Sequence, residues 1–462
     1  MELGNLGSRF ASLFFRIRAG RVLGLGLFLT GLLTYRSFNR AVFGFWSYGF
    51  FLFILAVSAL WLAELASSLR MLRLSNADFG SGGCAVAKLL DLAILTWGAA
   101  FFLDARDTPD KALRFAELVF FGSILPAAAL LEWITLVFLF LALVIFMVPR
   151  LKGKWAQGGL AVGTILVLAL VGEGICRVKV AVSPQLEPFP TNSQALWKRR
   201  YVKLNREGWR DADHAISGEA GTRRLLVVGD SFAYGLGIAH IEDRLGELLA
   251  KKLVTMTDER WEPINVSFGG GNTLDEIELL NRAVIYKPDV VLLIYVFNDM
   301  NYLLPATPED ETIFKPGGKF HPVMILFRNS FLFQELYLYY HIVYWRLTGA
   351  DFGKEYEDAQ LLSRHLQDVA RFVSIARQAG ANVWVIPFSI RIVHSPQWLH
   401  RYRTFVDQAR AHSIPVCSLE KSFDGFTYRQ LNINMFDGHP NERANLLATK
   451  AVAECLGTEL RR

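Results

Sequence analysis

The sequence predicts an N-terminal α-helical transmembrane domain over residues 1–180, followed by an α/β domain with a parallel sheet over residues 223–462. The first observation is composition: the chain of 462 residues is 52% hydrophobic, which is high for a soluble protein. The second is charge, because residues 1–180 carry 17 Lys and Arg against 10 Asp and Glu, whereas the remainder is nearly neutral. The third is a change at residue 224 from long apolar stretches to short strands alternating with helical patterns. The basic charge therefore flanks apolar segments, which argues against a nucleic-acid-binding protein.

Five apolar stretches in the first 180 residues predict membrane-spanning helices, with a sixth helix as the alternative. The second stretch is the clearest, because residues 41–63 carry no charge over a length that crosses a hydrocarbon core of ~30 Å. The fourth is too long for one simple span and contains Pro126 and Glu132, so it is either one long kinked helix or two paired helices. The five stretches are residues 20–35, 41–66, 86–103, 115–148 and 157–176.

Clusters of Lys and Arg predict the orientation, because cytoplasmic loops are enriched in these residues. With five spans, all three clusters lie on the cytoplasmic side and the C-terminal half lies outside. A sixth span within 115–148 reverses this orientation, and Arg36 and Arg40 depart mildly from the rule. The clusters are Arg9, Arg16, Arg18 and Arg21; Arg70 and Arg73; and Arg150, Lys152 and Lys154.

Three carboxylates fall inside the apolar stretches, where charged side chains are costly and often functional. They are Asp91, Glu132 and Glu173. The interpretation we favour is that they lie near the interfaces or bond to neighbouring helices, and the alternative is a functional role.

The polar half begins with a loop-rich linker and entry segment over residues 181–222. Apolar runs then predict strands over 224–229, 262–267, 289–297, 382–388 and 414–418. Helical patterns lie between them, over 242–256, 273–286, 357–379, 397–412 and 441–457. An inserted segment, residues 301–356, combines prolines and glycines with an aromatic-dense run over 327–345. This segment either roofs the site, contacts the membrane or packs on the domain core.

The first candidate site residue is Ser231, in the turn Gly229-Asp-Ser231. A serine just past a buried parallel strand lies at the carboxyl edge of the sheet, where open α/β folds bind their ligands. Ser231 is therefore a candidate nucleophile. A Gly-Asp-Ser turn by itself is more often only a turn.

A serine nucleophile needs a base and donors for the developing oxyanion. Among nine histidines, His439 follows a carboxylate, Asp437, which can hold the ring and stabilise its protonated form. Two further loops follow strand ends: the glycine-rich stretch over 266–273, and the stretch ending the most apolar strand with Asn298. The first can bring a backbone N–H close to a substrate, and the second offers a side-chain amide. The Lys-Ser/Thr pair of a Walker phosphate loop is absent.

These four stretches together resemble the SGNH/GDSL hydrolase family over residues 196–457. They match its Ser block (Gly229-Asp-Ser231), Gly block (Asn265 to Thr273), Asn block (Asn298-Asp299) and His block (Asp437-Gly-His439). Three further segments, 205–211, 287–289 and 315–330, resemble a bacterial membrane-linked branch of the family. The resemblance implies a three-layer, flavodoxin-like α/β domain and a place in the bacterial cytoplasmic (inner) membrane. It does not cover the membrane half.

By that resemblance Ser231 is the nucleophile and His439 the general base, which Asp437 orients. The N–H groups of Ser231 and Gly270 and the side chain of Asn298 form the oxyanion hole, with Gly269 or Gly271 as alternatives to Gly270. Two features depart from the family pattern. Phe297 replaces a glycine that often precedes the Asn, which narrows the pocket if the ring faces it. Asp437 lies two residues before the His instead of three.

The implied reaction is acyl transfer through an acyl-enzyme, with no metal or organic cofactor. The leading hypothesis is a membrane-anchored serine esterase acting on envelope glycans or lipids. The alternatives are an O-acetyltransferase that modifies an exported polysaccharide, working with the envelope polysaccharide machinery, and a catalytically inactive envelope scaffold. The partners expected are the lipid bilayer and an acylated glycan or lipid.

The four cysteines show no spacing typical of a metal site. Cys417 and Cys455 pair only in an oxidising compartment, and two buried thiols are the interpretation we favour.

Overall fold

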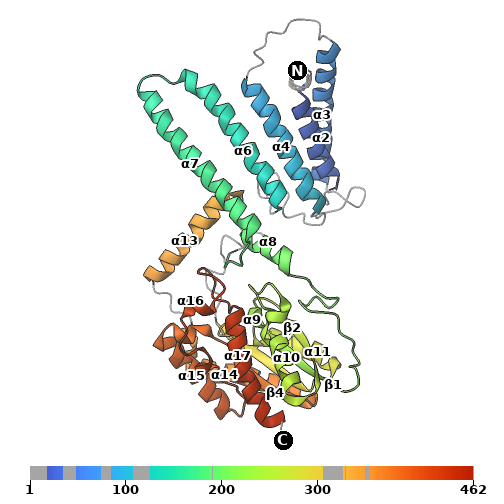
Figure 1. Cartoon of the computed structure of the whole chain (residues 1–462), viewed down its shortest axis with the longest axis vertical. Helices are drawn as coiled ribbons and strands as arrows, with labels where there is room; N and C mark the ends of the chain where they lie inside the picture. The colour runs from blue at the N-terminus through green and yellow to red at the C-terminus, as the bar shows by residue number, and fades with distance from the viewer. Residues whose placement is uncertain are drawn as a thin grey trace. The chain divides into compact units, whose positions relative to one another are not determined.

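The computed structural model describes residues 18–34, 48–73, 85–107, 125–189, 191–304, 326–327, 329–348 and 353–460. It divides into two compact units, one of helices and one of α/β type, whose elements are labelled in Figure 1. The helical unit comprises Met1–Pro184, Pro190–Leu196 and Ile313–His341. The α/β unit comprises Gln185–Phe189, Trp197–Thr312 and Ile342–Arg462. Part of the segment that interrupts the α/β pattern thus clusters with the helical unit.

Apolar helices make up the helical unit. Four of them are long and apolar enough to cross a membrane, namely α3 (Tyr48–Arg73), α4 (Ala85–Asp107), α6 (Pro126–Met147) and α7 (Lys154–Val182). The shorter apolar helix α2 (Ala19–Thr34) precedes them. Each of the five predicted stretches thus contains a helix, and four of these helices reach the length of a span.

The helix α6 begins at Pro126, so this proline does not kink a longer helix. Pro126 occupies the first helical turn, where the missing N–H costs nothing and the fixed φ angle suits the helix. The preceding part of the predicted 115–148 stretch, and with it the question of a sixth span, lies outside the described residues. So do residues 41–47 of the second stretch and several of the arginines that predict orientation.

Close backbone approach fixes the packing of α2 against α4. A Cβ atom added to Gly98 would lie 1.9 Å from the carbonyl oxygen of Gly24, and one added to Gly24 would lie 2.3 Å from that of Ile94. Neither position admits a larger side chain. Small residues at such contacts let apolar helices associate in a lipid environment, where hydrophobic burial gives no driving force.

All three carboxylates inside the apolar stretches are paired with arginines, which lie on a neighbouring helix for Asp91 and Glu132 and on the same helix for Glu173. Asp91 of α4 binds Arg21 of α2, with 2.8 Å between Oδ1 and Nη2. Glu132 of α6 and Glu173 of α7 both bind Arg177 of α7, each at 2.8 Å. The favoured interpretation, bonding to neighbouring helices, is confirmed.

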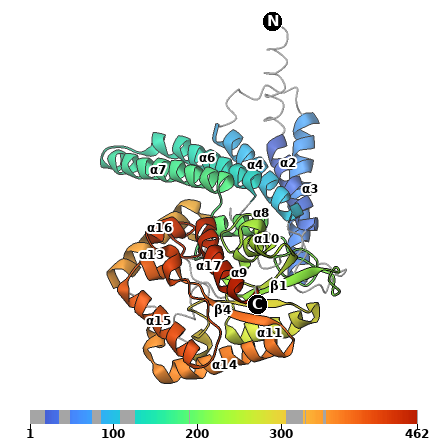
Figure 2. The same ribbon diagram turned by 60° about the horizontal axis from the view of Figure 1, so that its bottom comes forward.

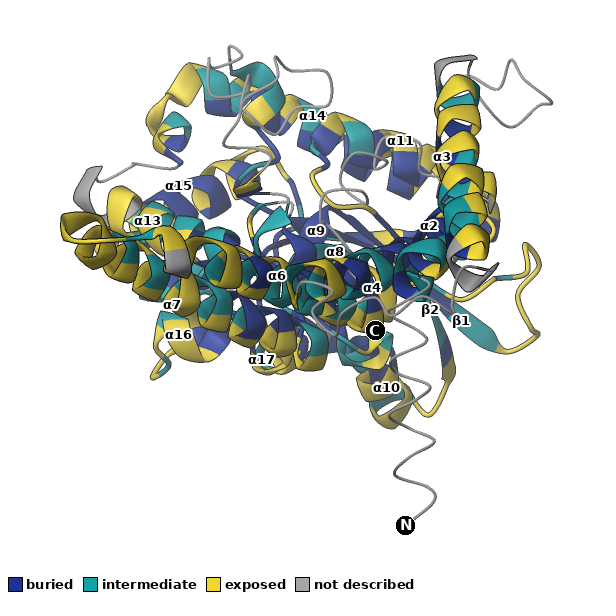
Figure 3. Ribbon diagram, turned by 90° about the horizontal axis from the view of Figure 1, so that it is seen from above, coloured by how far each residue is buried: buried dark blue, intermediate teal, exposed yellow. Residues whose placement is uncertain are grey.

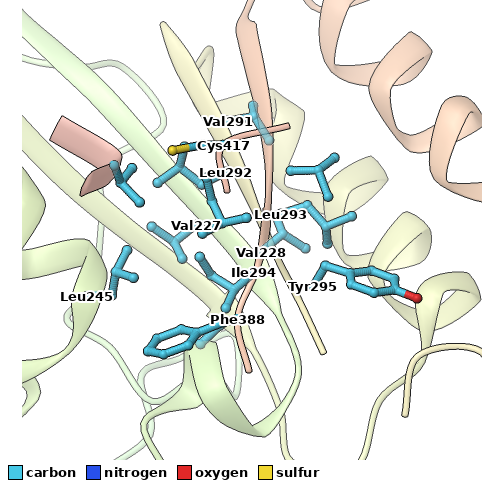
Figure 4. Close-up of a cluster of buried hydrophobic side chains, with 14 of the residues drawn as sticks. Val227, Val228, Leu245, Val291, Leu292, Leu293, Ile294, Tyr295, Phe388 and Cys417 are labelled. Atoms are coloured by element: carbon cyan, nitrogen blue, oxygen red, sulfur yellow. The ribbon is translucent and has the colours of Figure 1, made fainter. Parts of the chain in front are cut away.

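The α/β unit contains a parallel sheet of four strands in the order β2-β1-β3-β4. Its strands are β1 (Thr222–Gly229), β2 (Arg260–Ser267), β3 (Val290–Tyr295) and β4 (Asn382–Pro387). Apolar side chains fill both faces of the sheet, and every residue of β3 is buried (Figure 3). The close-up in Figure 4 shows this core, including Val227, Leu292 and Phe388. Buried faces on both sides require two covering layers of helices.

Helices cover both faces of this sheet (Figure 2). The helices α10 (Leu245–Thr257) and α17 (Glu442–Leu460) pack together on one face. On the other face α11 (Thr273–Ala283) packs against α14 (Ala359–Gln378), and α15 (Pro396–Ala411) follows β4. This is the predicted three-layer α/β architecture.

The structure differs from the prediction in two elements of the α/β half. The fifth predicted strand, 414–418, is only an isolated parallel bridge between Val416 and Val385. Pro415 next to it lacks the N–H that a strand ladder requires. The linker contains the helix α8 (Asn192–Tyr201).

Cys417 and Cys455 form a disulfide, so the expectation of two buried thiols is wrong. Their Cα atoms lie 6.1 Å apart, within the range that disulfides span. Cys455 lies on α17, whereas Cys417 follows the bridge at Val416, and 38 positions of sequence separate the two. Only the folded chain brings the two Cα atoms this close, so the sequence alone does not indicate that the cysteines pair.

Replacing Cys417 and Cys455 by alanine together should lower the free energy of unfolding of the α/β unit by up to about 4 kcal/mol, because the unfolded chain loses a covalent loop. Mass spectrometry of a non-reduced digest of the wild type should show the two cysteine peptides joined. Cys176→Ala, which removes a free thiol, is the control and should keep the joined peptides. Separate peptides from the wild type would contradict the disulfide.

Candidate active site

The turn after β1 presents Ser231. Asp230 caps the short helix α9 (Ser231–Tyr234), and its Oδ1 accepts a hydrogen bond from the Phe232 N–H at 3.0 Å. The Ser231 hydroxyl donates to Asp230 Oδ2 at 3.1 Å, and Ser231 is 8% exposed. Gly229 is required here, because a Cβ atom would lie 2.8 Å from Ala233 and 2.9 Å from the carbonyl oxygen of Ile294.

Asn298 lies next to this turn because β3 pairs directly with β1, which brings their carboxyl ends together. Its Nδ2 donates a hydrogen bond to Asp230 Oδ2 at 3.0 Å. Asp230 therefore accepts hydrogen bonds from both Ser231 and Asn298. A side-chain amide carries two N–H groups, so Asn298 keeps a second donor for another oxygen.

Gly270 lies in the loop after β2 and adopts a left-handed backbone, with φ of 85°. Nothing lies within 4 Å of the place a Cβ atom would take, so the space on that side of its Cα atom is open. At Gly269 and Gly271 that place is occupied, by Leu236 and by Phe268 respectively. The loop continues into α11 through an Asn272 capping box, and the Thr273 N–H donates to the carbonyl oxygen of Asp299 at 3.3 Å. This bond ties the glycine loop to the Asn298 loop.

His439 and Asp437 are in direct contact, although only one residue separates them. Asp437 Oδ1 accepts hydrogen bonds from the backbone N–H of His439 at 2.9 Å and from His439 Nδ1. The His439 ring packs beside the Phe232 ring, with 5.3 Å between centroids, so it lies close to the Ser231 turn. In this structure the Ser231 hydroxyl bonds Asp230, and no hydrogen bond between Ser231 and His439 occurs among the described residues. Such bonds are often formed only when substrate binds.

The electrostatics of the pair favour a charged imidazole. Burial lowers the pKa of His439, but the carboxylates of Asp437 and Asp230 raise it by more, so the net pKa lies above the ordinary value. Burial raises the pKa of Asp437, but the charge and hydrogen bonds of His439 lower it by more. Asp437 therefore remains ionised and holds the ring in one orientation.

Sequence reasoning missed a set of three fully buried carboxyls around the Ser231 turn, namely Asp230, Glu276 and Asp299. Burial raises the pKa of each of them, and for Glu276 and Asp299 the neighbouring negative charges add to this effect. Asp230 has three hydrogen-bond donors to stabilise its charge. No hydrogen bond reaches either carboxylate oxygen of Glu276 among the described residues, so Glu276 is the member that best holds a proton. The sequence contains one indication of this set of buried carboxyls, because Glu276 occupies an inward-facing position of α11.

The segment 205–211, noted above only as part of the family resemblance, supports the site loops. Arg210 donates hydrogen bonds at 2.6 Å to the carbonyl oxygens of Gly235 and Ile238, in the loop that follows Ser231. Asp211 accepts from the Asn265 N–H at 2.6 Å, at the start of the Gly block. The segment thus connects two of the four blocks.

Phe297 belongs to the core and does not narrow a pocket. It is 7% exposed, and its ring packs 4.7 Å from Tyr356 and 5.9 Å from Phe405, centroid to centroid. Arg391, in contrast, lies near the site: its Nη2 is 3.4 Å from where a Cβ atom on Gly438 would be. Its positive charge lowers the pKa of both Asp437 and His439. No local pattern in the sequence marks Arg391.

No family model matches the chain, and no curated protein matches it either. Solved structures of lipases, esterases and acylhydrolases are similar to its second half. TesA shares 16% identity at a TM-score of 0.33, covering 51% of this chain and 98% of TesA. A lipase/acylhydrolase from Enterococcus faecalis shares 16% identity at 0.33, covering 51% of this chain and 96% of its own. The psychrotrophic esterase EstA from Pseudoalteromonas sp. shares 15% identity at 0.31, covering 52% and 100%.

These similarities extend over about half of the chain. The identities and TM-scores are low. What the site can do chemically therefore follows from its own residues, namely a hydroxyl, an imidazole paired with a carboxylate, and an amide donor.

With rising pH, the variant Glu276→Gln should lose less of its stability against unfolding than the wild type does. The pKa of Glu276 is higher in the folded than in the unfolded chain, so its stabilising contribution is present at low pH and is lost as pH rises. One such proton changes the stability by up to about 1.4 kcal/mol per pH unit. The unfolding temperature of the wild type in detergent should therefore fall more steeply than that of the variant as the pH rises above the ordinary pKa of a Glu side chain.

The exposed Glu278 lies on the same helix, and Glu278→Gln should follow the wild type. Equal slopes for wild type and Glu276→Gln would show that Glu276 is ionised throughout.

Proposed function

We propose that the α/β unit is a serine acyl hydrolase or acyl transferase, with Ser231 as nucleophile, His439 as general base and Asp437 as the group that orients the base. The observation that carries this proposal is the hydrogen-bonded arrangement at the carboxyl edge of the sheet. There Asp230 bonds both Ser231 and Asn298, while the paired Asp437 and His439 pack beside Phe232.

The first step forms an acyl-enzyme. The Ser231 hydroxyl leaves Asp230, gives its proton to His439 Nε2 and attacks an ester carbonyl carbon, while Asp437 stabilises the imidazolium through Nδ1. The N–H groups of Ser231 and Gly270 and the free amide hydrogen of Asn298 stabilise the tetrahedral oxyanion. Gly270 suits this role because the space beside its Cα atom is open, so that a substrate can approach it. His439 then protonates the departing alcohol.

The second step releases the acyl group. Water gives a free acid and makes the protein an esterase, and a sugar hydroxyl gives a new ester and makes it an O-acetyltransferase. The acyl-enzyme is common to both, so incubation with an acetylated donor and a glycan acceptor separates them by product: acyl groups gained on the glycan mean transfer. The substrate class we infer is an acylated glycan or lipid of the cell envelope.

The location we infer is a bacterial cytoplasmic membrane, with the α/β unit on its outer side. The helices α3, α4, α6 and α7 support membrane anchoring by length and composition. The disulfide between Cys417 and Cys455 supports an oxidising compartment for the α/β unit, because cytosolic thiols are kept reduced.

The wild type should react covalently with a fluorophosphonate probe, and Ser231→Ala should lower the labelling at least about 1,000-fold because the attacking oxygen is gone. The exposed Ser374 provides the control variant, Ser374→Ala, which should label normally. A membrane-impermeant probe applied to intact spheroplasts tests the location as well, since labelling only after lysis would place the site inside. A wild type that resists the probe and fails to hydrolyse short p-nitrophenyl esters would favour an inactive scaffold.

The labelling rate should rise with pH through an inflection above the ordinary His value, because only neutral His439 acts as a base and its pKa is raised. Asp437→Asn should shift this inflection to lower pH and reduce the plateau rate by about 100- to 10,000-fold, since the ring loses both its charge partner and its orientation. The exposed Asp424 gives the control, Asp424→Asn, with an unchanged profile. An unshifted inflection in Asp437→Asn would remove Asp437 from the mechanism.

A further inference from the structure

The helix α13 (Phe331–Thr348) exposes one continuous apolar and aromatic face. Its members are spaced three and four residues apart, so they share one side of the helix. They are 47–60% exposed: Leu336, Tyr339, Tyr340, Val343 and Tyr344, called the tyrosine face below. The opposite side is buried and includes Phe331, Gln334 and Leu338. A helix that is apolar on its exposed as well as its buried side is unusual in water and ordinary in contact with lipid.

The start of α13 is fixed to the end of α7. The Glu173 carboxylate accepts hydrogen bonds from the backbone N–H groups of Phe331 at 3.1 Å and Leu332 at 3.0 Å, and from the Ser330 hydroxyl at 2.8 Å. A carboxylate at a helix N-terminus satisfies unpaired N–H groups and complements the helix dipole. Arg177 holds Glu173 in place, and its guanidinium lies 4.7 Å from the centroid of the Phe331 ring. The helix therefore starts at a defined position along α7.

The distance of Glu173 from the start of α7 matches the thickness of a hydrocarbon core. Lys154 begins α7, and Glu173 follows 19 residues later, which is about 28 Å along the axis and close to the thickness of a hydrocarbon core. The whole helix has 29 residues, so its last turns extend past that core. Lys179, in these turns, binds Glu335 of α13 at 2.6 Å.

The exposed side of α7 remains apolar over the same turns. Val171, Ile175, Val178 and Val182 are all more than 50% exposed and lie three or four residues apart. An apolar surface thus extends along α7 on both sides of Glu173. The tyrosine face begins within two turns of the Glu173 contact, at Leu336.

We propose that α13 is an interfacial helix and that its tyrosine face lies in the headgroup region of the same bilayer that α7 spans. Tyrosine suits this depth, because its ring enters the apolar layer while its hydroxyl reaches water and headgroups. Leu336 and Val343 supply the apolar contact with acyl chains, as in other helices that lie in a membrane surface. This inference rests on α7 and α13 and does not depend on the proposed activity of Ser231.

Nitroxide labels in the full chain, reconstituted in lipid nanodiscs, test the proposal. Cys84 and Cys176 are first replaced by alanine, and single cysteines are then introduced as Leu336→Cys, Tyr340→Cys and Val343→Cys. Oxygen concentrates in lipid, whereas a nickel chelate stays in water. The ratio of oxygen collisions to nickel collisions should therefore be several-fold higher for each label on the tyrosine face than for a label in water. Ile165→Cys, near the middle of the α7 span and 65% exposed, is the lipid reference, and Lys251→Cys on the exposed side of α10 is the water reference.

Labels on the tyrosine face that behave like the one at Lys251 would overturn the proposal, because the face would then be in water. Labels that neither reagent reaches would overturn it as well, since a protein surface or a second copy would then cover the face. Because three positions on one face are labelled, the other two still test the proposal if any single variant fails to fold.

Discussion

The parallel pairing of β1 with β3 is the constraint on which the site depends. In-register pairing from Leu225 with Val290 to Gly229 with Ile294 brings the two strand ends together, and the buried Asp230 carboxylate then bonds Ser231 from one turn and Asn298 from the other. A buried charge of this kind is tolerated only when donors surround it. The same bonds that stabilise Asp230 in the core therefore fix the spacing of Ser231 and Asn298.

The fold and the four site loops could be predicted because their signals are local. The apolar run before Ser231, the one before Asn298 and the glycine-rich loop each identify a strand end by composition alone, and their order along the chain carries the family resemblance. The features that could not be predicted are contacts between residues that lie far apart in the sequence. Asp230 and Asn298 are 68 positions apart, and nothing beside either residue indicates the other. The fifth strand failed for a different reason, since Pro415 satisfies an apolar pattern but cannot donate to a ladder.

In the helical unit, as around Asp230, a buried charged side chain is held by several partners at once. Arg177 forms ion pairs with two carboxylates, and one of these, Glu173, also accepts hydrogen bonds from three donors at the start of α13. Breaking a buried pair leaves an uncompensated charge, which is far more costly than the pair itself. The sequence predicted that these acids bond to neighbouring helices but gave no indication that one of them also holds the inserted segment, because that partner is about 157 residues away.

The disulfide has a consequence for how the site persists. Asp437 and His439 both lie between Cys417 and Cys455, so the residues proposed as the base and its partner lie within a covalent ring, while Ser231 and Asn298 lie outside it. Fluctuations that loosen α17 leave both ends of this ring joined. A reducing environment would open the ring without changing any of the four residues of the proposed site.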